Sequence, residues 1–150
     1  MKSNKNIKKY VAIAMVTKEG CVLVQHRDNI PNIASPDMFA ICGGKQEKID
    51  PTLKHAAARE LLEETGYKVK LKDLQILQHD EFDTPTGYVT RDFYWCIYDE
   101  VQPIQCLEGQ SIKFYDINEI SDLEFCDPYH RKYLKEASNK VTLYDRGSRR

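Results

Sequence analysis

Apolar segments alternate with turn-forming segments along the first part of the chain. Residues 11–17 are almost entirely apolar, and residues 21–26 repeat this pattern after Lys-Glu-Gly at 18–20. A continuous apolar run of this length is typical of a strand that is buried on both faces, and a short glycine-containing break favours a hairpin. We therefore predict a β-hairpin whose first strand is central in a sheet.

The later part of the chain alternates between strand and helix patterns. Thr84-Pro85-Thr86-Gly87 carries the residue types of a hairpin tip. The predicted elements are strands at 39–41, 67–71, 74–82, 88–98 and 112–115, a helical turn at 116–120 and an amphipathic helix at 128–137. Residues 138–150 are polar, and we expect them to form a mobile tail.

A helix with start and stop signals follows the strand predicted at 39–41. Pro51 suits the first turn of a helix, Asp50 is a suitable N-cap, and Gly66 is a suitable left-handed residue just after the last turn. The sequence therefore predicts a helix of ordinary length that begins at Pro51 and ends before Gly66.

Three glutamates share one face of this helix. Glu60, Glu63 and Glu64 are spaced i, i+3 and i+4, which places their carboxylates together. Their repulsion costs roughly 0.2–0.5 kcal/mol per pair in water, and a divalent cation such as Mg²⁺ or Mn²⁺ would reverse its sign. Arg59 is positioned to pair with Glu63 and to orient it. The alternative is a solvated acidic surface, which is the commoner meaning of a charge run.

Composition indicates one globular domain. With 150 residues, of which 41% are hydrophobic and 30% charged, the chain can bury one sizeable core, so we predict a single domain at 1–150. A net charge of -1 provides no bulk attraction to nucleic acids or anionic membranes, and no apolar run has the length of a transmembrane helix. We therefore expect neither nucleic-acid nor membrane partners.

Cysteine usage and the N-terminal segment indicate a reducing compartment. The five cysteines are scattered and never spaced as C-x-x-C, so the pattern indicates neither a disulfide framework nor a zinc site. The basic segment at 1–10 is followed by an apolar stretch that Lys18 and Glu19 interrupt, which is too short for a signal peptide. We therefore predict a cytoplasmic protein.

The acidic helix and the glycines ahead of it form a longer pattern. Residues 59–67, preceded by Gly-Gly-Lys at 43–45, resemble the Nudix hydrolase box, written G-x5-E-x7-R-E-U-x-E-E-x-G-U with U an apolar residue. The second half of the box is matched without a gap by Arg59, Glu60, Leu61, Glu63, Glu64, Gly66 and Tyr67. In the first half, Pro51 stands where the box has its first glutamate. A one-residue insertion before the helix would let Asp50 replace that glutamate.

The resemblance implies a fold and an activity. The fold is an α/β/α sandwich around a mixed β-sheet, which agrees with the predicted order of elements. The activity is hydrolysis of a diphosphate linkage in a small-molecule nucleotide by metal-activated water, with Mg²⁺ or alternatively Mn²⁺ as the cofactor. Homodimers are common in the resembled family, although nothing in this sequence indicates an interface.

The resemblance also implies metal ligands and a general base. Glu60, Glu63 and Glu64 would bind the metal ion together with a main-chain carbonyl that a sharp turn at Gly43-Gly44 directs toward the helix. Glu108 lies in a Glu-Gly-Gln loop ahead of a strand and would be a further ligand or the general base. Glu60 is the other candidate for the base.

Substrate contacts are implied for three further residues. Arg27, at the end of the second strand, would contact substrate phosphate, Lys45 would neutralise charge on the leaving phosphate, and Asp127 lies where related hydrolases place a base-contacting residue. We rank nucleoside triphosphates first as substrates, and nucleotide sugars or other nucleoside diphosphate derivatives second. The alternatives are a catalytically silent Nudix-fold module that senses a nucleotide and an acidic surface helix on an unrelated domain.

Overall fold

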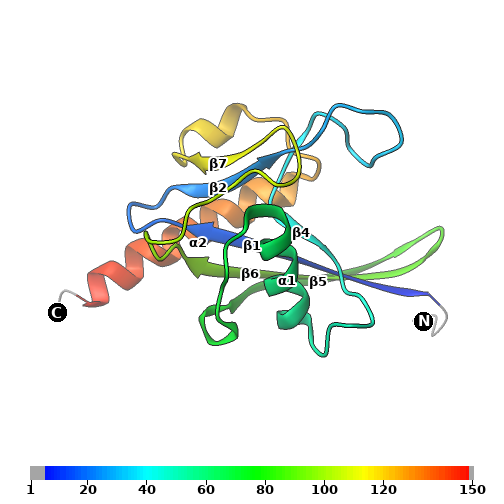
Figure 1. Ribbon diagram of the computed structural model, residues 1–150, viewed down its shortest axis with the longest axis horizontal. Helices are drawn as coiled ribbons and strands as arrows, with labels where there is room; N and C mark the ends of the chain where they lie inside the picture. The colour runs from blue at the N-terminus through cyan, green and yellow to red at the C-terminus, as the bar shows by residue number, and fades with distance from the viewer. Residues whose placement is uncertain (1–5, 149–150) are drawn as a thin grey trace.

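A mixed β-sheet lies between two long helices (Figure 1). The computed structural model describes residues 6–148, and the side chains of residues 6–141. The elements are β1 (Ile7–Val16), β2 (Val22–His26), β3 (Phe39–Ala40), β4 (Cys42–Lys45), α1 (Leu53–Thr65), the 3₁₀ turn η1 (Leu71–Asp73), β5 (Gln75–Thr84), β6 (Gly87–Ile97), β7 (Ser111–Tyr115), the 3₁₀ turn η2 (Glu119–Asp122) and α2 (Pro128–Ser148). The strand order is β3-β2-β1-β6-β5, with β4 paired to β1 and β7 paired to β2.

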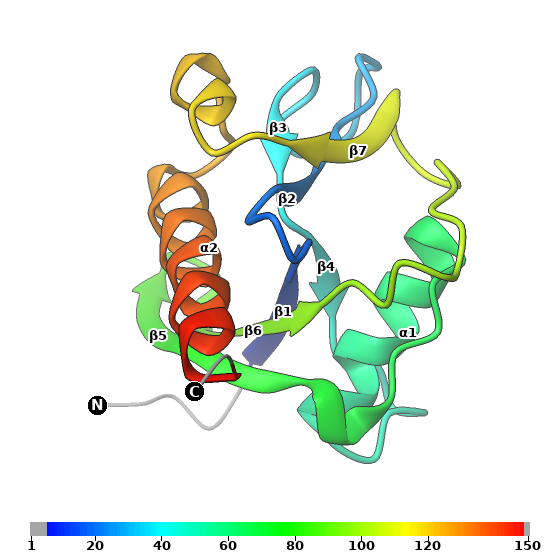
Figure 2. The ribbon, with the colours of Figure 1, turned by 90° about the vertical axis from the view of Figure 1, so that its left-hand side faces the viewer.

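The central strand β1 is buried on both faces. Ala12 and Ala14 belong to the core under α2, whereas Ile13 and Met15 belong to the core under α1. Figure 2 shows α1 and α2 on opposite sides of the sheet. A strand covered on both faces needs an apolar side chain at every position, which explains the continuous apolar run at 11–17. The predicted α/β/α sandwich and the central place of this strand are confirmed.

The predicted hairpin at 11–26 is present as a turn, but its strands pair mainly with other partners. β1 and β2 meet antiparallel at Val16 and Val22. β1 runs parallel to β6 along its whole length, and it pairs antiparallel with β4 between Tyr10 and Ile13. β2 pairs with β3 and β7. The divergence of β1 and β2 makes room for β4, which lies against α1.

Gly43 and Gly44 are extended residues of β4, so the predicted sharp turn at these positions is wrong. Neither glycine has a positive φ angle, and their backbones pair with Ala12 and Val11. A Cβ atom on Gly43 would lie 2.1 Å from the Val11 carbonyl oxygen, and one on Gly44 would lie 2.5 Å from the carboxylate of Glu60. The glycines therefore serve close packing of β4 against β1 and α1.

α1 begins later than predicted, and Asp50 is not its N-cap. The helix starts at Leu53, and the Thr52 hydroxyl caps it by accepting a hydrogen bond from a backbone N–H of the first turn. Gly66 ends the helix in the left-handed conformation with φ of 76°, as predicted. Pro51 therefore precedes the helix, and the carboxylate of Asp50 is free to bind a side chain elsewhere.

Three other predicted boundaries differ from the structure. Residues 67–71 are not a strand: the segment leads from α1 into η1 and packs Tyr67 into the core under α1 without pairing with the sheet. The turn predicted at 116–120 forms as η2. α2 continues to Ser148, so the predicted helix end at 137 is wrong. Ser138 is buried and donates a hydrogen bond of 2.8 Å to the Gly20 carbonyl, which docks the helix on the β1–β2 turn.

The structure describes neither residues 1–5 nor residues 149–150. Residues 149 and 150 of the predicted tail lie outside the described residues. Within residues 6–148, no helix has both the length and the apolar character that crossing a membrane requires.

Gly43→Ala is expected to destabilise the protein. The new methyl group would overlap the Val11 carbonyl oxygen, which belongs to the central strand, and overpacking of this kind costs about 1–3 kcal/mol. Thermal denaturation would record this cost as a lower Tm. Gly44→Ala is the matched control, because its methyl group would meet the rotatable end of the Glu60 side chain. Equal Tm values for Gly43→Ala and the wild type would contradict the close packing of β4.

Candidate active site

Arg59 joins the acidic face of α1 to the loop that precedes the helix. Its guanidinium donates hydrogen bonds of 2.9–3.2 Å to both carboxylate oxygens of Asp50. It also donates to Glu60 and to Glu63, each at 3.1 Å, and to the Lys45 carbonyl at 3.0 Å. The pairing of Arg59 with Glu63 that the sequence suggested is present. Arg59 therefore orients three carboxylates at once.

Asp50 holds Arg59 in place. Its side chain is buried, and it also accepts a hydrogen bond of 2.9 Å from the backbone N–H of Glu47. The hydrogen bonds from Arg59 keep the pKa of Asp50 below its usual value, so this carboxylate is ionised at neutral pH. Because both of its oxygens face Arg59, Asp50 serves as an anchor of the arginine.

Glu60 and Glu63 have different surroundings although both bind Arg59. The side chain of Glu60 is 14% exposed, and its carboxylate lies against the backbone of Gly44. Burial raises the pKa of Glu60, and the charges of Glu63 and Glu108 add to the effect while Arg59 opposes it. The side chain of Glu63 is 56% exposed. Glu60 is thus the inner of the two acids.

Glu64 is the most buried acidic residue of α1. Only 2% of its surface is exposed. Its Oε1 accepts a hydrogen bond of 3.3 Å from the Gln25 side chain, whereas Oε2 is buried and has no partner among the described residues. Burial, and then the charges of Glu108 and Glu60, raise the pKa of Glu64 to about 9. A carboxylate in this position is short of a cation.

The residues present fit a divalent metal ion that is shared with substrate oxygens. Among the described residues, no three His, Cys, Asp or Glu side chains already gather as a complete binding group. Glu64 nevertheless has a buried oxygen without a partner, and the pKa values of Glu60 and Glu64 are both raised. Mg²⁺ retains several water molecules and takes phosphate oxygens as ligands, so an incomplete protein ligand set suits it.

Gln25, which the sequence analysis did not single out, connects Glu64 with the Glu108 loop. Its side-chain amide donates to Glu64 Oε1 and to the Glu108 carbonyl oxygen, both at 3.3 Å. The charge of Glu108 reaches both Glu60 and Glu64, since it raises the pKa of each. A polar residue in the apolar strand at 22–26 was the available signal, because buried amides occur where they have a partner.

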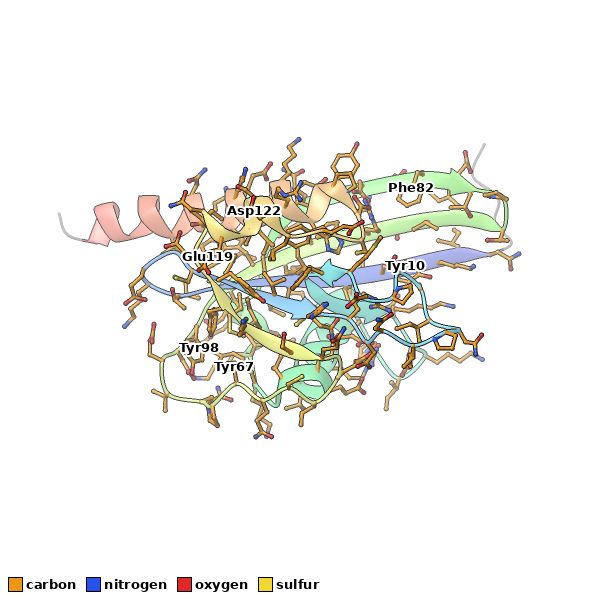
Figure 3. All side chains as sticks on the ribbon, turned by 90° about the horizontal axis from the view of Figure 1, so that it is seen from above. Tyr10, Tyr67, Phe82, Tyr98, Glu119 and Asp122 are labelled. Atoms are coloured by element: carbon orange, nitrogen blue, oxygen red, sulfur yellow. The ribbon has the colours of Figure 1, made fainter. Side chains whose placement is uncertain are left out.

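A cavity of about 500 Å³ adjoins the glycines of β4. Its lining includes Gly43-Gly44, Arg27 and Asp127, so the structure brings these predicted site residues around one space. Tyr10 on β1 and Phe82 on β5 also line it and are labelled in Figure 3. A space of this size is typical of sites for small-molecule ligands.

Lys45 lies outside this cavity. Its side chain lines a separate depression of about 340 Å³ that also includes Lys9 and Lys48. Its backbone carbonyl, which accepts the hydrogen bond from Arg59, is the part of Lys45 that touches the acidic cluster. The predicted contact between its ammonium group and a phosphate therefore requires a substrate that extends past β4.

Two residues of the cavity lining, Arg91 and Asp127, belong to an ion-pair network that the sequence analysis missed. Arg91 donates to the two oxygens of Asp80 at 2.8 Å each and to Asp127 at 2.6 Å. Its guanidinium lies 5.1 Å from the ring centre of Phe82 and 5.3 Å from that of Phe93. Strand alternation places Arg91 on the same face as Phe93, and a charged residue at an inward position of an aromatic strand was the signal available.

Comparisons with known proteins agree with this geometry. The NUDIX domain family matches residues 7–140. No curated protein matches the sequence. Among solved structures, the fold is similar to the MutT protein from Methanosarcina mazei Go1, with a TM-score of 0.71 and 19% identity over 93% of this chain and 98% of that chain.

Two further structures share the fold. The NUDIX domain of Shewanella oneidensis NrtR, complexed with ADP ribose, gives a TM-score of 0.74 and 16% identity over 91% of this chain and 90% of that chain. A bifunctional NMN adenylyltransferase/ADP ribose pyrophosphatase from Francisella tularensis, complexed with AMP and a Mn ion, is similar with a TM-score of 0.61. The two sequences are 22% identical, and the match covers 95% of this chain and 42% of that chain. The family match spans most of the sequence and includes the acidic helix, so the chain belongs to the Nudix family and is a Nudix hydrolase.

Proposed function

We propose that this Nudix hydrolase uses Mg²⁺ to hydrolyse a diphosphate linkage in a nucleoside triphosphate or a related nucleoside diphosphate derivative. The observation that carries the proposal is the buried, unpartnered Oε2 of Glu64 beside Glu60 and the glycine strand β4. Such an arrangement is costly in the absence of a cation. The adjoining cavity offers space for the part of the substrate that does not react.

We propose that the metal ligands come from the acidic face of α1, the glycines of β4 and the Glu108 loop. Glu60 and Glu64, with a backbone carbonyl of Gly43 or Gly44, would hold the ion, and Glu63 and Glu108 are further ligands of its shell. A bound divalent ion screens the charge of the phosphates and lowers the pKa of a water molecule. Mn²⁺ has the same ligand preferences and is the alternative ion.

The chain's own groups would position the nucleophile and accept its proton. The oxygen of water attacks phosphorus, the bond from phosphorus to the bridging oxygen breaks, and the leaving phosphate departs with that oxygen. Glu60 or Glu108 accepts the proton that water loses. Burial raises the pKa of Glu60, which makes it a better proton acceptor near neutral pH than an ordinary carboxylate. The products are a nucleoside monophosphate and pyrophosphate, or two phosphorylated halves.

The cavity is proposed to hold the nucleoside. Arg27 would contact phosphate near its entrance, where its Nε donates to the Ala34 carbonyl at 2.9 Å and is thereby held on the loop after β2. Asp127 would contact the base, and Lys45 the leaving phosphate. Nucleoside triphosphates rank first as substrates, and nucleotide sugars second. A cytoplasmic location and action as a single domain remain predictions from the sequence.

Glu64→Gln is expected to lower kcat by about 100-fold or more, because an uncharged amide is a poor ligand for a hard cation. Release of phosphate or pyrophosphate from a panel of nucleoside triphosphates and nucleotide sugars, with Mg²⁺ and with a chelator, would measure it. Glu19→Gln makes the same chemical change in the exposed β1–β2 turn and should keep wild-type activity. Near-normal hydrolysis by Glu64→Gln would refute the assignment, and a wild type that binds nucleotides without hydrolysing any would favour the sensor alternative.

Glu64→Gln is also expected to stabilise the metal-free protein. The folded state keeps the proton of Glu64 up to about pH 9, whereas the unfolded chain releases it near the ordinary value of 4.5, so this group lowers stability progressively as pH rises between those values. Glutamine does not ionise, and the Tm advantage of Glu64→Gln should therefore grow from pH 5 to pH 8 in chelator. Added Mg²⁺ should raise the Tm of the wild type more than that of the variant. A constant Tm difference across this pH range would show that Glu64 is not the cation-deficient group.

A further inference from the structure

His130, in the first turn of α2, has a fixed hydrogen-bonding role. Its Nδ1 accepts a hydrogen bond of 3.0 Å from the backbone N–H of Ile41. An imidazole nitrogen that accepts such a bond carries no proton, so the neutral ring must carry its hydrogen on Nε2. The ring is also held edge-on against Phe93, with 5.6 Å between the ring centres. Its orientation and its tautomer are therefore both set by the protein.

The Nε2–H of His130 is available to a ligand. The residue lines the cavity that adjoins β4, and no described residue accepts a hydrogen bond from Nε2. Burial lowers the pKa of His130 to about 4, so the ring is neutral at physiological pH. His130 thus adds an N–H donor without a partner among the described residues to the lining of the cavity.

Asp127, which also lines the cavity, has the opposite role. Its Oδ2 accepts from Arg91 at 2.6 Å and its Oδ1 accepts from the Tyr129 N–H at 2.8 Å. Burial tends to raise the pKa of Asp127, but the hydrogen bonds from Arg91 and from the backbone lower it overall, so the side chain is an ionised acceptor. Each carboxylate oxygen has lone pairs left for a second bond. Asp80 holds Arg91 through two hydrogen bonds of 2.8 Å, which fixes the pair.

The surroundings of this donor and acceptor are largely apolar and partly aromatic. Phe82, Val89 and Phe93 line the same cavity, as does Ile41, whose N–H binds His130. Aromatic and apolar walls with a few directed polar groups are typical of pockets for planar heterocycles. His130 and Asp127 lie three positions apart, both line the cavity, and the charge of Asp127 acts on the His130 ring. A donor and an acceptor on one wall match the edge of a nucleobase, where acceptor and donor atoms are neighbours.

We propose that His130 determines base specificity by donating its Nε2–H to an acceptor atom on the nucleobase, whose neighbouring donor binds Asp127. This inference rests on the proposed function only in taking the cavity as the nucleoside site. Donation by Nε2–H depends on the hydrogen bond from Ile41, because loss of that bond would allow the proton to move to Nδ1. Ile41 directly precedes β4, so the residue that orients His130 belongs to the same backbone segment as the glycines next to the acidic cluster.

Two substitutions separate recognition of the base by His130 from its structural hydrogen bond with Ile41. His130→Asn keeps an acceptor near the position of Nδ1, which can serve the Ile41 N–H, but it lacks a donor at the position of Nε2. His130→Gln reaches the position of Nε2 with an amide donor and loses the acceptor for Ile41. A purely structural role predicts that Gln is the more harmful change for ligand binding, whereas base recognition predicts that Asn is.

Calorimetric binding of non-hydrolysable ligands would test the proposal without relying on turnover. The ligands are the α,β-imido analogues of ATP, GTP, CTP and UTP, and α,β-imido ribose 5-triphosphate, which has no base. We expect the wild type to prefer one base. His130→Asn should weaken the preferred analogue about tenfold, the effect of leaving one buried hydrogen bond unmade, and should change the Kd of the baseless probe less than about twofold. His130→Gln should retain the preference.

Three results would overturn the proposal. They are equal wild-type affinity for all four analogues and the baseless probe, an equal loss of affinity for every ligand in His130→Asn, and unchanged affinity in that variant. Hydrolysis of the natural nucleotides, measured in parallel, separates this inference from the proposed function. A base preference in binding that depends on His130, without hydrolysis, would support the inference and refute the hydrolase proposal. Hydrolysis that does not depend on the base would support the hydrolase proposal and refute the role of His130 in base recognition.

Discussion

The backbone of β4 lies against both β1 and α1 because Gly43 and Gly44 have no Cβ atoms. A side chain at Gly43 would meet the carbonyl oxygen of Val11, and one at Gly44 would meet the carboxylate of Glu60. This double approach brings the backbone of β4 to the acidic face of the helix. The divergence of β1 from β2 is part of the same arrangement, since β4 takes the place beside β1 that a regular hairpin would fill. The rest of the site is built around this contact.

The negative charges of the acidic cluster are compensated unequally, because Arg59 binds the outer acids but not Glu64. Arg59 binds Asp50, Glu60 and Glu63, so one guanidinium compensates part of the negative charge in the outer part of the cluster. Glu64 is farther inside, where the Gln25 amide offers one hydrogen bond and no charge. A protein that buries a carboxylate in this way loses stability unless a cation joins it. The shortage of positive charge is therefore greatest at Glu64, near the C-terminal end of α1 and next to β4.

The cavity extends from the glycine strand toward the first turn of α2, and its two ends differ in chemistry. The end at β4 is next to carboxylates and backbone, whereas the far end has aromatic walls and the Asp80–Arg91–Asp127 network. His130 links the ends, since it lies on α2 and accepts a hydrogen bond from Ile41 just before β4. This division suits a ligand with a charged part and a planar part. α2 lines the cavity directly through His130, whereas the acidic face of α1 adjoins it only through Gly44, against which the Glu60 carboxylate lies.

The sequence by itself determined the features that depend on local spacing. The apolar run at 11–17 required a strand buried on both faces, the spacing of Glu60, Glu63 and Glu64 placed three acids on one helical face, and Gly66 ended that helix. Tertiary structure decided the features that depend on contacts between distant segments. Asp50 binds Arg59 instead of capping α1, the glycines are extended because β1 and α1 approach them, and Ser138 continues α2 by docking on the β1–β2 turn. Gln25, Arg91 and His130 gained their partners in the same way, because hydrogen bonds across strands and helices leave no periodic signal in the chain.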